Sequence, residues 1–117
     1  MKTMNREWVR NYCLSLPHTT EHALWKIDLV FKIGGKMYAT LVLEPHPVCL
    51  AFKCTPEDFD ELIERPGIIP APYAARQKWV ALESFEALQH KELEPRLQRA
   101  YALIFAKLPK KTQRELS

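Results

Sequence analysis

The segment His18-Thr19-Thr20-Glu21-His22 has the residue types and order of a zinc peptidase motif. In the H-x-x-E-H pattern, two histidines one helical turn apart bind zinc and the glutamate activates a water molecule. The surrounding sequence argues against that chemistry, because Pro17 directly precedes the segment, an obvious third ligand is missing and 117 residues leave little room for a peptidase cleft. We therefore expect a polar loop in which Glu21 fixes the backbone, and no metal site.

The three cysteines, Cys13, Cys49 and Cys54, are the other candidates for chemistry. Their number is odd, they lack C-x-x-C spacing, and no neighbouring histidine marks a nucleophile. Each lies in or beside an apolar run, which is typical of reduced, partly buried thiols in the cytosol. We predict no catalytic residue, no disulfide scaffold and a cytoplasmic protein that is not an enzyme.

Lysines and a tyrosine surround a Gly-Gly pair in segment 31–39, which has the pattern of a β-hairpin. A two-residue turn would pair Phe31 with Tyr38 and mix the core and solvent faces. A three-residue loop with Gly35 in the left-handed conformation instead pairs Phe31 with Met37, and so keeps the large apolar residues of both strands inside. We predict the three-residue loop.

This register gathers cations on the other face of the sheet. Lys32 then lies opposite Lys36, and the four-residue turn 44–47 places Tyr38 across from Lys53. Opposed like charges destabilise a sheet by roughly a few tenths of a kcal/mol, and an anionic partner such as phosphate would relieve them. The patch of Lys32, Lys36, Tyr38 and Lys53 is either an anion-binding surface or a solvated sheet face.

The elements that position these residues follow from periodicity and capping signals. Apolar residues at helical spacing predict helices from Asn5 to Pro17 and over 92–108, and Thr55-Pro56 opens a short helix between them. Alternation predicts strands over 27–33, 37–43, 48–52 and 78–82, with an irregular or edge-strand segment at 66–72. The order α-β-β-β-α-β-α predicts an α+β fold in which terminal helices pack on one face of a mostly antiparallel sheet.

Length and charge limit the remaining possibilities. A chain of 117 residues that is 47% apolar fits one domain, which we place at 1–108, followed by a basic tail at 109–117. The net charge is only +3, so attraction to an anionic partner must come from local clustering. Since no stretch approaches the roughly 18 consecutive apolar residues of a membrane span, we expect a soluble protein without a membrane partner. We also expect a monomer.

Several sequence blocks together resemble a known family. The blocks are Leu16-Pro17 with Glu21, segment 31–39, Lys53, Arg65-Pro66-Gly67, Pro70-Ala71-Pro72-Tyr73 and Lys78-Trp79-Val80. In this order and spacing they resemble the MmcQ/YjbR-like proteins of bacteria, over residues 4 to 108. The resemblance implies a CyaY-like fold, shared with frataxins, and a proposed "double wing" DNA-binding role without a cofactor.

The resemblance adds residues to the candidate nucleic-acid site. Carried over onto this chain, it implies contacts by Lys36, Lys53, Tyr73, Lys78 and Trp79, and it supplies no catalytic residue. Aromatic residues of this kind can stack on bases, although the strand position of Trp79 also suits the core or the floor of a groove.

The sequence alone is also compatible with two other functions. The sheet face could instead dock a protein partner, as frataxin-like domains can. Frataxin-like metal binding is a further alternative, because hard cations could bind weakly to the acidic face of the short central helix, although that face also suits plain solvation. The residues of this face are Glu57, Asp58, Asp60, Glu61 and Glu64.

Overall fold

An antiparallel sheet of six strands, in the order β1-β2-β3-β4-β6-β5, forms the frame of the protein. The computed structural model describes residues 6–24, 28–42, 48–72 and 74–116. The strands are β1 (Thr20–Leu24), β2 (Asp28–Ile33), β3 (Lys36–Val42), β4 (Leu50–Lys53), β5 (Ile68–Pro70) and β6 (Trp79–Leu82). The helices are α1 (Arg6–Ser15), α2 (Pro56–Leu62), α3 (His90–Lys107) and α4 (Lys110–Leu116), with short 3-10 turns η1 (Ala75–Gln77) and η2 (Phe85–Ala87).

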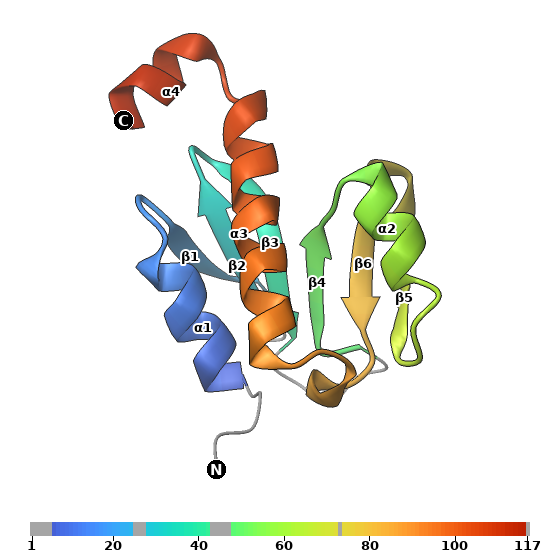
Figure 1. The fold of residues 1–117 in the computed structure, drawn as a ribbon. Helices are drawn as coiled ribbons and strands as arrows, with labels where there is room; N and C mark the ends of the chain where they lie inside the picture. Colours follow the sequence, from blue (N-terminus) through green and yellow to red (C-terminus); the bar gives the residue numbers. More distant parts are fainter. Residues whose placement is uncertain (1–5, 25–27, 43–47, 73, 117) are drawn as a thin grey trace.

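Helices α1 and α3 lie on the same face of the sheet (Figure 1). Alternate strand residues point into this layer, so the main core forms between the sheet and these helices. Its fully buried side chains include Phe31, Leu41, Phe52, Val80, Leu93 and Leu97. The predicted α+β fold, with terminal helices packed on one face of an antiparallel sheet, is confirmed.

Helix α2 begins where the sequence signals placed it. The Thr55 hydroxyl accepts a hydrogen bond from the backbone N–H of Asp58 at 3.0 Å, and Pro56 occupies the first turn. This cap satisfies one of the N–H groups that a helix start leaves without a partner.

The β2–β3 hairpin differs from the prediction, and the three-residue loop is wrong. Ile33 pairs with Lys36 across a two-residue turn, in which both glycines have positive φ (59° and 84°). The register then shifts, so that Lys32 pairs with Met37 but Phe31 pairs with Ala39. This β-bulge absorbs one residue and keeps Phe31 and Ala39 in the core, which removes the conflict that had argued against the short turn.

Three further segments are more regular than expected. Strand β1 replaces the predicted polar loop, and its mostly exposed side chains explain why no apolar alternation signalled it. Segment 66–72 had been predicted as either irregular or an edge strand, and it contains strand β5. Helix α4 occupies most of the predicted basic tail. The predicted cap Asn5, the turn at 44–47 and Tyr73 lie outside the described residues.

Candidate functional site

Three lysines from distant parts of the chain meet at one end of the sheet. Lys53, the last residue of β4, is only 8% exposed, and its ammonium group donates a hydrogen bond to the backbone carbonyl of Gln77. Burial lowers the pKa of Lys53, and the ammonium group of Lys107 at the end of α3 lowers it further, with a smaller effect from Lys78. Both effects disfavour the charged form of Lys53.

Lys78 is held at this end by its backbone and by an aromatic ring. It adopts the left-handed conformation (φ 65°) between η1 and β6, and its ammonium group lies 5.0 Å from the centre of the Phe59 ring. A cation over an aromatic face is attracted by the ring electrons. The ammonium group of the predicted candidate Lys78 is therefore held in place by these two features.

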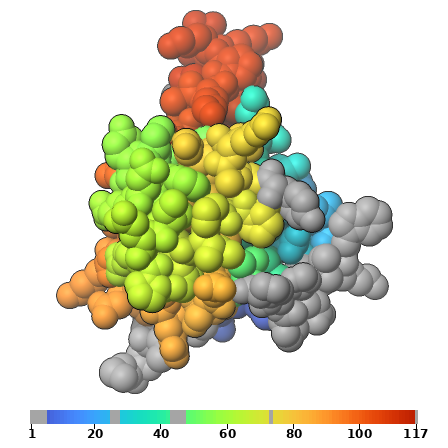
Figure 2. All heavy atoms as spheres, turned by 90° about the vertical axis from the view of Figure 1, so that its right-hand side faces the viewer, coloured from blue at the N-terminus to red at the C-terminus, as the bar shows by residue number. Residues whose placement is uncertain are grey.

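The tip of the β2–β3 hairpin belongs to the same end of the molecule. Gly34 lies so close to Leu108 that a Cβ atom there would be 2.6 Å from Cδ1 of the leucine. Figure 1 shows the hairpin tip near the C-terminal end of α3, and Figure 2 shows α4 at this end of the molecule. We call the following residues of this region the basic end: Lys32, Lys36, Lys53, Lys78, Lys107, Lys110, Lys111 and Arg114.

Arginines and lysines have different partners in this protein. Each ion pair within the described residues uses an arginine: Arg10 with Glu21, Arg65 with Glu92, Arg96 with Asp58 and Glu61, and Arg99 with Asp58. No lysine takes part in an ion pair in that part of the chain. The lysine charges of the basic end are therefore not neutralised by direct pairing within the described structure.

Tyr38 does not contribute to a cationic surface, which corrects the predicted patch. Its side chain is fully buried, and its hydroxyl donates to the carbonyl of Cys13 at 3.2 Å and lies 2.9 Å from the Thr19 hydroxyl. The ring meets Tyr101 edge-on at 5.5 Å, and burial raises the pKa of Tyr38. The bulge explains this placement, because it turns Tyr38 toward the helices.

The direct opposition of Lys32 and Lys36 is also wrong. Lys36 lies opposite Ile33, whereas Lys32 lies opposite Met37, so successive pairs place the two lysines on different faces. The predicted β3–β4 register is correct in the described ladder, since Ala39 pairs with Phe52 as the count around the turn requires.

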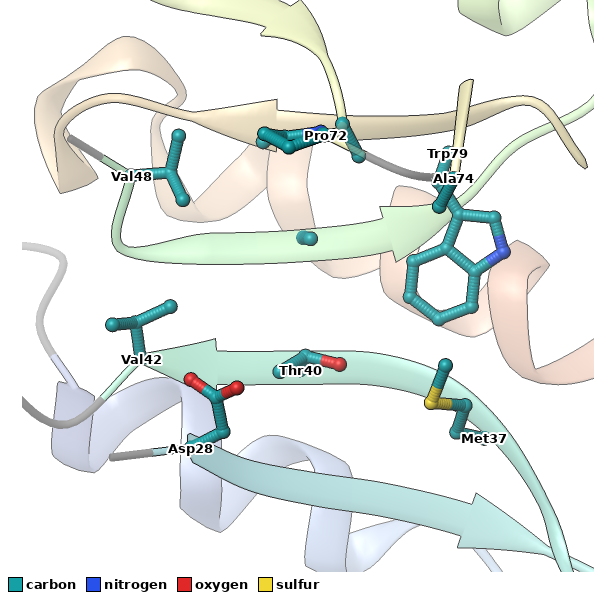
Figure 3. Close-up of a pocket in the computed structure, with 11 residues that line it drawn as sticks. Asp28, Met37, Thr40, Val42, Val48, Pro72, Ala74 and Trp79 are labelled. Atoms are coloured by element: carbon teal, nitrogen blue, oxygen red, sulfur yellow. The ribbon is translucent and has the colours of Figure 1, made fainter. Parts of the chain in front are cut away.

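The face of the sheet opposite α1 and α3 carries a groove of about 430 Å³ that the sequence did not reveal. Small side chains form its floor, because Thr40, Ala51 and Ala81 are direct neighbours across β3, β4 and β6. Trp79 and Met37 stand at one end and Asp28 with Val42 and Val48 at the other, as Figure 3 shows. Trp79 is 7% exposed and lines this groove, in agreement with one of its two expected positions.

The motif that resembles a zinc site serves a different purpose. Glu21 lies on strand β1 and accepts two hydrogen bonds of 2.8 Å from the guanidinium of Arg10 on α1. His18 and His22 are therefore not one helical turn apart. Within the described residues, histidine, cysteine, aspartate and glutamate form no group of three that could hold a metal ion.

The acidic face of α2 is partly used for packing against α3. Asp58 is nearly buried and contacts Arg96 at 2.8 Å and Arg99 at 2.6 Å, and Glu61 contacts Arg96 at 2.9 Å. Burial alone would raise the pKa of Asp58, but the two arginines outweigh it and lower the pKa. These two carboxylates stabilise the contact between helices.

Comparison with known proteins identifies the family. A family model described as YjbR matches residues 14–103. The chain belongs to the YjbR family. A crystal structure of a structural-genomics target from Pseudomonas syringae shares the YjbR fold of this chain, with a TM-score of 0.72 and 23% sequence identity over 86% of this chain and 98% of the other. No curated protein matches.

The family assignment agrees with the resemblance found in the sequence blocks. Residues 14–103 of this YjbR protein include the hairpin, Lys53 and the Lys78-Trp79 pair. They end before Lys107 and α4, so the matched region includes only part of the basic end. Within the described residues, no helix is both long and apolar enough to cross a membrane.

Proposed function

We propose that this YjbR protein is a small cytoplasmic, non-enzymatic protein whose basic end binds the phosphate backbone of nucleic acid. The observation that carries the proposal is the environment of Lys53. Lys53 as a residue is only 8% exposed, and burial together with the charges of Lys107 and Lys78 lowers the pKa of its ammonium group. A phosphate group at this point would offset the repulsion and accept charge-assisted hydrogen bonds.

The distribution of ion pairs supports the same function. Arginines form the ion pairs within the described residues, while no lysine of the basic end is paired with a carboxylate there. Lysine contacts to phosphate fix a protein on a nucleic acid without reading its sequence. We therefore expect binding that depends little on sequence and falls steeply as salt rises.

The cysteines support a binding role rather than covalent catalysis. Burial raises the pKa of Cys13 and Cys54 to about 12 and that of Cys49 to about 11. A thiol must lose its proton to act as a nucleophile, so these side chains are poorly suited to that reaction at neutral pH.

A second candidate function is docking of a protein partner on the sheet face that carries the groove. In this case, too, the chain would act as a monomer. Met37 favours docking, since this large apolar side chain is 46% exposed beside the groove. Exposed apolar side chains often mark protein interfaces. Retention of a partner at high salt would favour this function over nucleic-acid binding.

Charge reversal at the basic end tests the proposed function. We expect the Lys36→Glu/Lys107→Glu variant to lose at least about tenfold in affinity for DNA, and the slope of log K against log salt to decrease by about 2. Fluorescence anisotropy with a labelled duplex and a labelled single strand, over a series of salt concentrations, measures both quantities.

A matched control distinguishes the effect of charge at the basic end from the effect of the net charge of the protein. Arg6→Glu/Lys91→Glu changes the net charge equally, but its exposed positions begin α1 and α3 at the opposite end (Figure 1). We expect only a small loss of DNA affinity. Equal losses in the two variants would contradict a site at the basic end.

The pKa of Lys53 provides an independent measurement. A bound phosphate stabilises the charged ammonium group, so the lowered pKa of Lys53 should rise when DNA is added. NMR titration of the lysine side chains, with Lys53→Met to assign the signal, measures this change. An unchanged pKa in a saturated complex would place the DNA elsewhere.

A further inference from the structure

The groove and the basic end are parts of one continuous surface. Trp79, at one end of the groove, is the direct cross-strand neighbour of Lys53. Met37, across the groove from Trp79 in Figure 3, is the cross-strand neighbour of Lys32. A ligand that leaves the groove between Trp79 and Met37 therefore meets two lysines of the basic end.

The opposite end of the groove has a different chemistry. Among the described residues that line the groove, Asp28 is the charged one, and its carboxylate can accept hydrogen bonds. Asp28 and Lys32 lie four residues apart on β2, about 13 Å along the strand at about 3.3 Å per residue. The surface thus has an acceptor at one end, an apolar slot in the middle and cations at the other end.

The groove has a shape that suits a flat ring. Its floor consists of the short side chains of Thr40, Ala51 and Ala81, and the flat indole ring of Trp79 lies at one end. A groove of about 430 Å³ also falls within the range of about 300 to 1,000 Å³ typical of small-molecule sites. Aromatic side chains bind nucleobases by stacking in single-strand binding proteins.

We propose that this groove holds one base of a single-stranded nucleic acid. The ring packs on the small-residue floor beside Trp79, an exocyclic amino group donates to Asp28, and the phosphate lies between Lys32 and Lys53. This inference rests on the proposed function and adds to it a preference for single strands, because the bases of a duplex are paired and stacked and cannot enter. It also adds a preference for bases with an amino group, such as adenine, over thymine.

The test compares three DNA molecules of equal strand length at one low salt concentration. They are a single strand rich in adenine, an abasic single strand with the same phosphates, and a duplex. We expect the adenine strand to bind roughly tenfold more tightly than the abasic strand, in line with the loss of one stacked base. Equal affinities for these two strands would overturn the inference while leaving phosphate binding by the basic end intact.

Filling the groove provides the second part of the test. Ala51→Leu places a larger side chain on the floor, and it should abolish the advantage of the adenine strand without changing affinity for the abasic strand. Ala23→Leu makes the same change on β1, outside the groove, and should leave the advantage intact. Thr40→Leu fills the same floor and replaces Ala51→Leu if thermal unfolding shows that the latter is not folded.

The Asp28→Asn variant and the outcomes below also test whether the groove holds a base. Asp28→Asn should reduce the preference for adenine over thymine, because the carboxylate becomes an amide. An undiminished adenine advantage in a folded floor variant would overturn the inference. Failure of all three DNA molecules to bind even at low salt would overturn the proposed function together with it.

Discussion

The hydroxyl of Tyr38 has a structural role that follows from its contacts. It links strand β3 to the carbonyl of Cys13 in α1 and to the hydroxyl of Thr19, so it ties the sheet to the first helix. Buried polar atoms need such partners, because an unpaired donor or acceptor away from water is costly. We therefore assign Tyr38 a structural role.

Replacing Tyr38 with phenylalanine tests this assignment. Tyr38→Phe keeps the ring contact with Tyr101 but leaves the buried Cys13 carbonyl without this donor. We expect the free energy of unfolding to fall by about 1 to 2 kcal/mol, with DNA affinity unchanged. Urea unfolding and anisotropy measure the two effects, and a large loss of affinity with unchanged stability would contradict a structural role.

At the scale of elements, the hairpin combines a tight turn with a bulge. The two glycines have the positive φ values that a two-residue hairpin turn of this kind requires. The bulge then restores the alternation of core residues further along both strands. The hairpin tip meets Leu108 as a result, which connects the turn to the junction of α3 and α4.

The two glycines should respond differently to alanine. Both substitutions place a Cβ in the left-handed region, at a cost of about 1 kcal/mol. Gly34→Ala also requires Leu108 to move, because the contact would be 2.6 Å, whereas nothing lies within 4 Å of a Cβ at Gly35. We expect Gly34→Ala to lower the free energy of unfolding more than Gly35→Ala.

Urea unfolding of both variants measures this difference. In the Leu108→Ala background the two costs should become similar, because the side chain that collides with the new Cβ is absent. A difference that persists there would mean that the contact with Leu108 is not its cause.

For the whole molecule, charge is divided between internal links and an external surface. Asp58 joins α2 to α3 through Arg96 and Arg99, and Glu21 joins β1 to α1 through Arg10. The lysines gather instead where β4 and α3 end, where β6 begins, and at the tip of the β2–β3 hairpin. Arginine pairs thus join the elements of the fold, while the lysines of the basic end form no ion pair within the described residues.

The internal links predict how stability depends on pH. Because the folded-state pKa of Asp58 is lowered, its stabilisation is complete above the unfolded pKa of about 3.9 and is lost as pH falls through the folded pKa. At neutral pH, Asp58→Asn should lower the free energy of unfolding by about 1 to 3 kcal/mol. The difference from wild type should shrink in acid, as urea unfolding at several pH values can show.

A neighbouring exposed pair provides the control for Asp58. The Glu61 side chain is 63% exposed and contacts only Arg96 among these arginines. Glu61→Gln should therefore cost less than about 1 kcal/mol. A similar loss of unfolding free energy in both variants would indicate that the nearly buried ion pairs of Asp58 stabilise the protein no more than the exposed pair of Glu61.

Much of the fold could be predicted from local patterns in the sequence. Helical spacing predicted α1 and α3, the Thr55-Pro56 pair predicted the start of α2, and residue counting predicted the β3–β4 register. These features depend on residues close together in the chain, so their signals can be read directly. The sequence blocks also indicate the YjbR family, which the match over residues 14–103 confirms.

The candidate site depended on information that local patterns do not contain. The conflict between a Gly-Gly turn and the apolar alternation was the available sign of a bulge, but only packing against α1 decides that Tyr38 turns inward. The groove could have been suspected from Thr40, Ala51 and Ala81, which are small residues on the same face of three strands.

The sequence by itself determined the α+β class, most helices and the family, because these follow from periodicity, capping and the order of blocks. Only the tertiary structure decided which lysines are neighbours. Lys53, Lys78 and Lys107 are separated by more than twenty residues from one another, and they meet because β4 and α3 end, and β6 begins, at the same side of the sheet. Contacts over such separations are set by packing of the whole chain, and no local pattern encodes them.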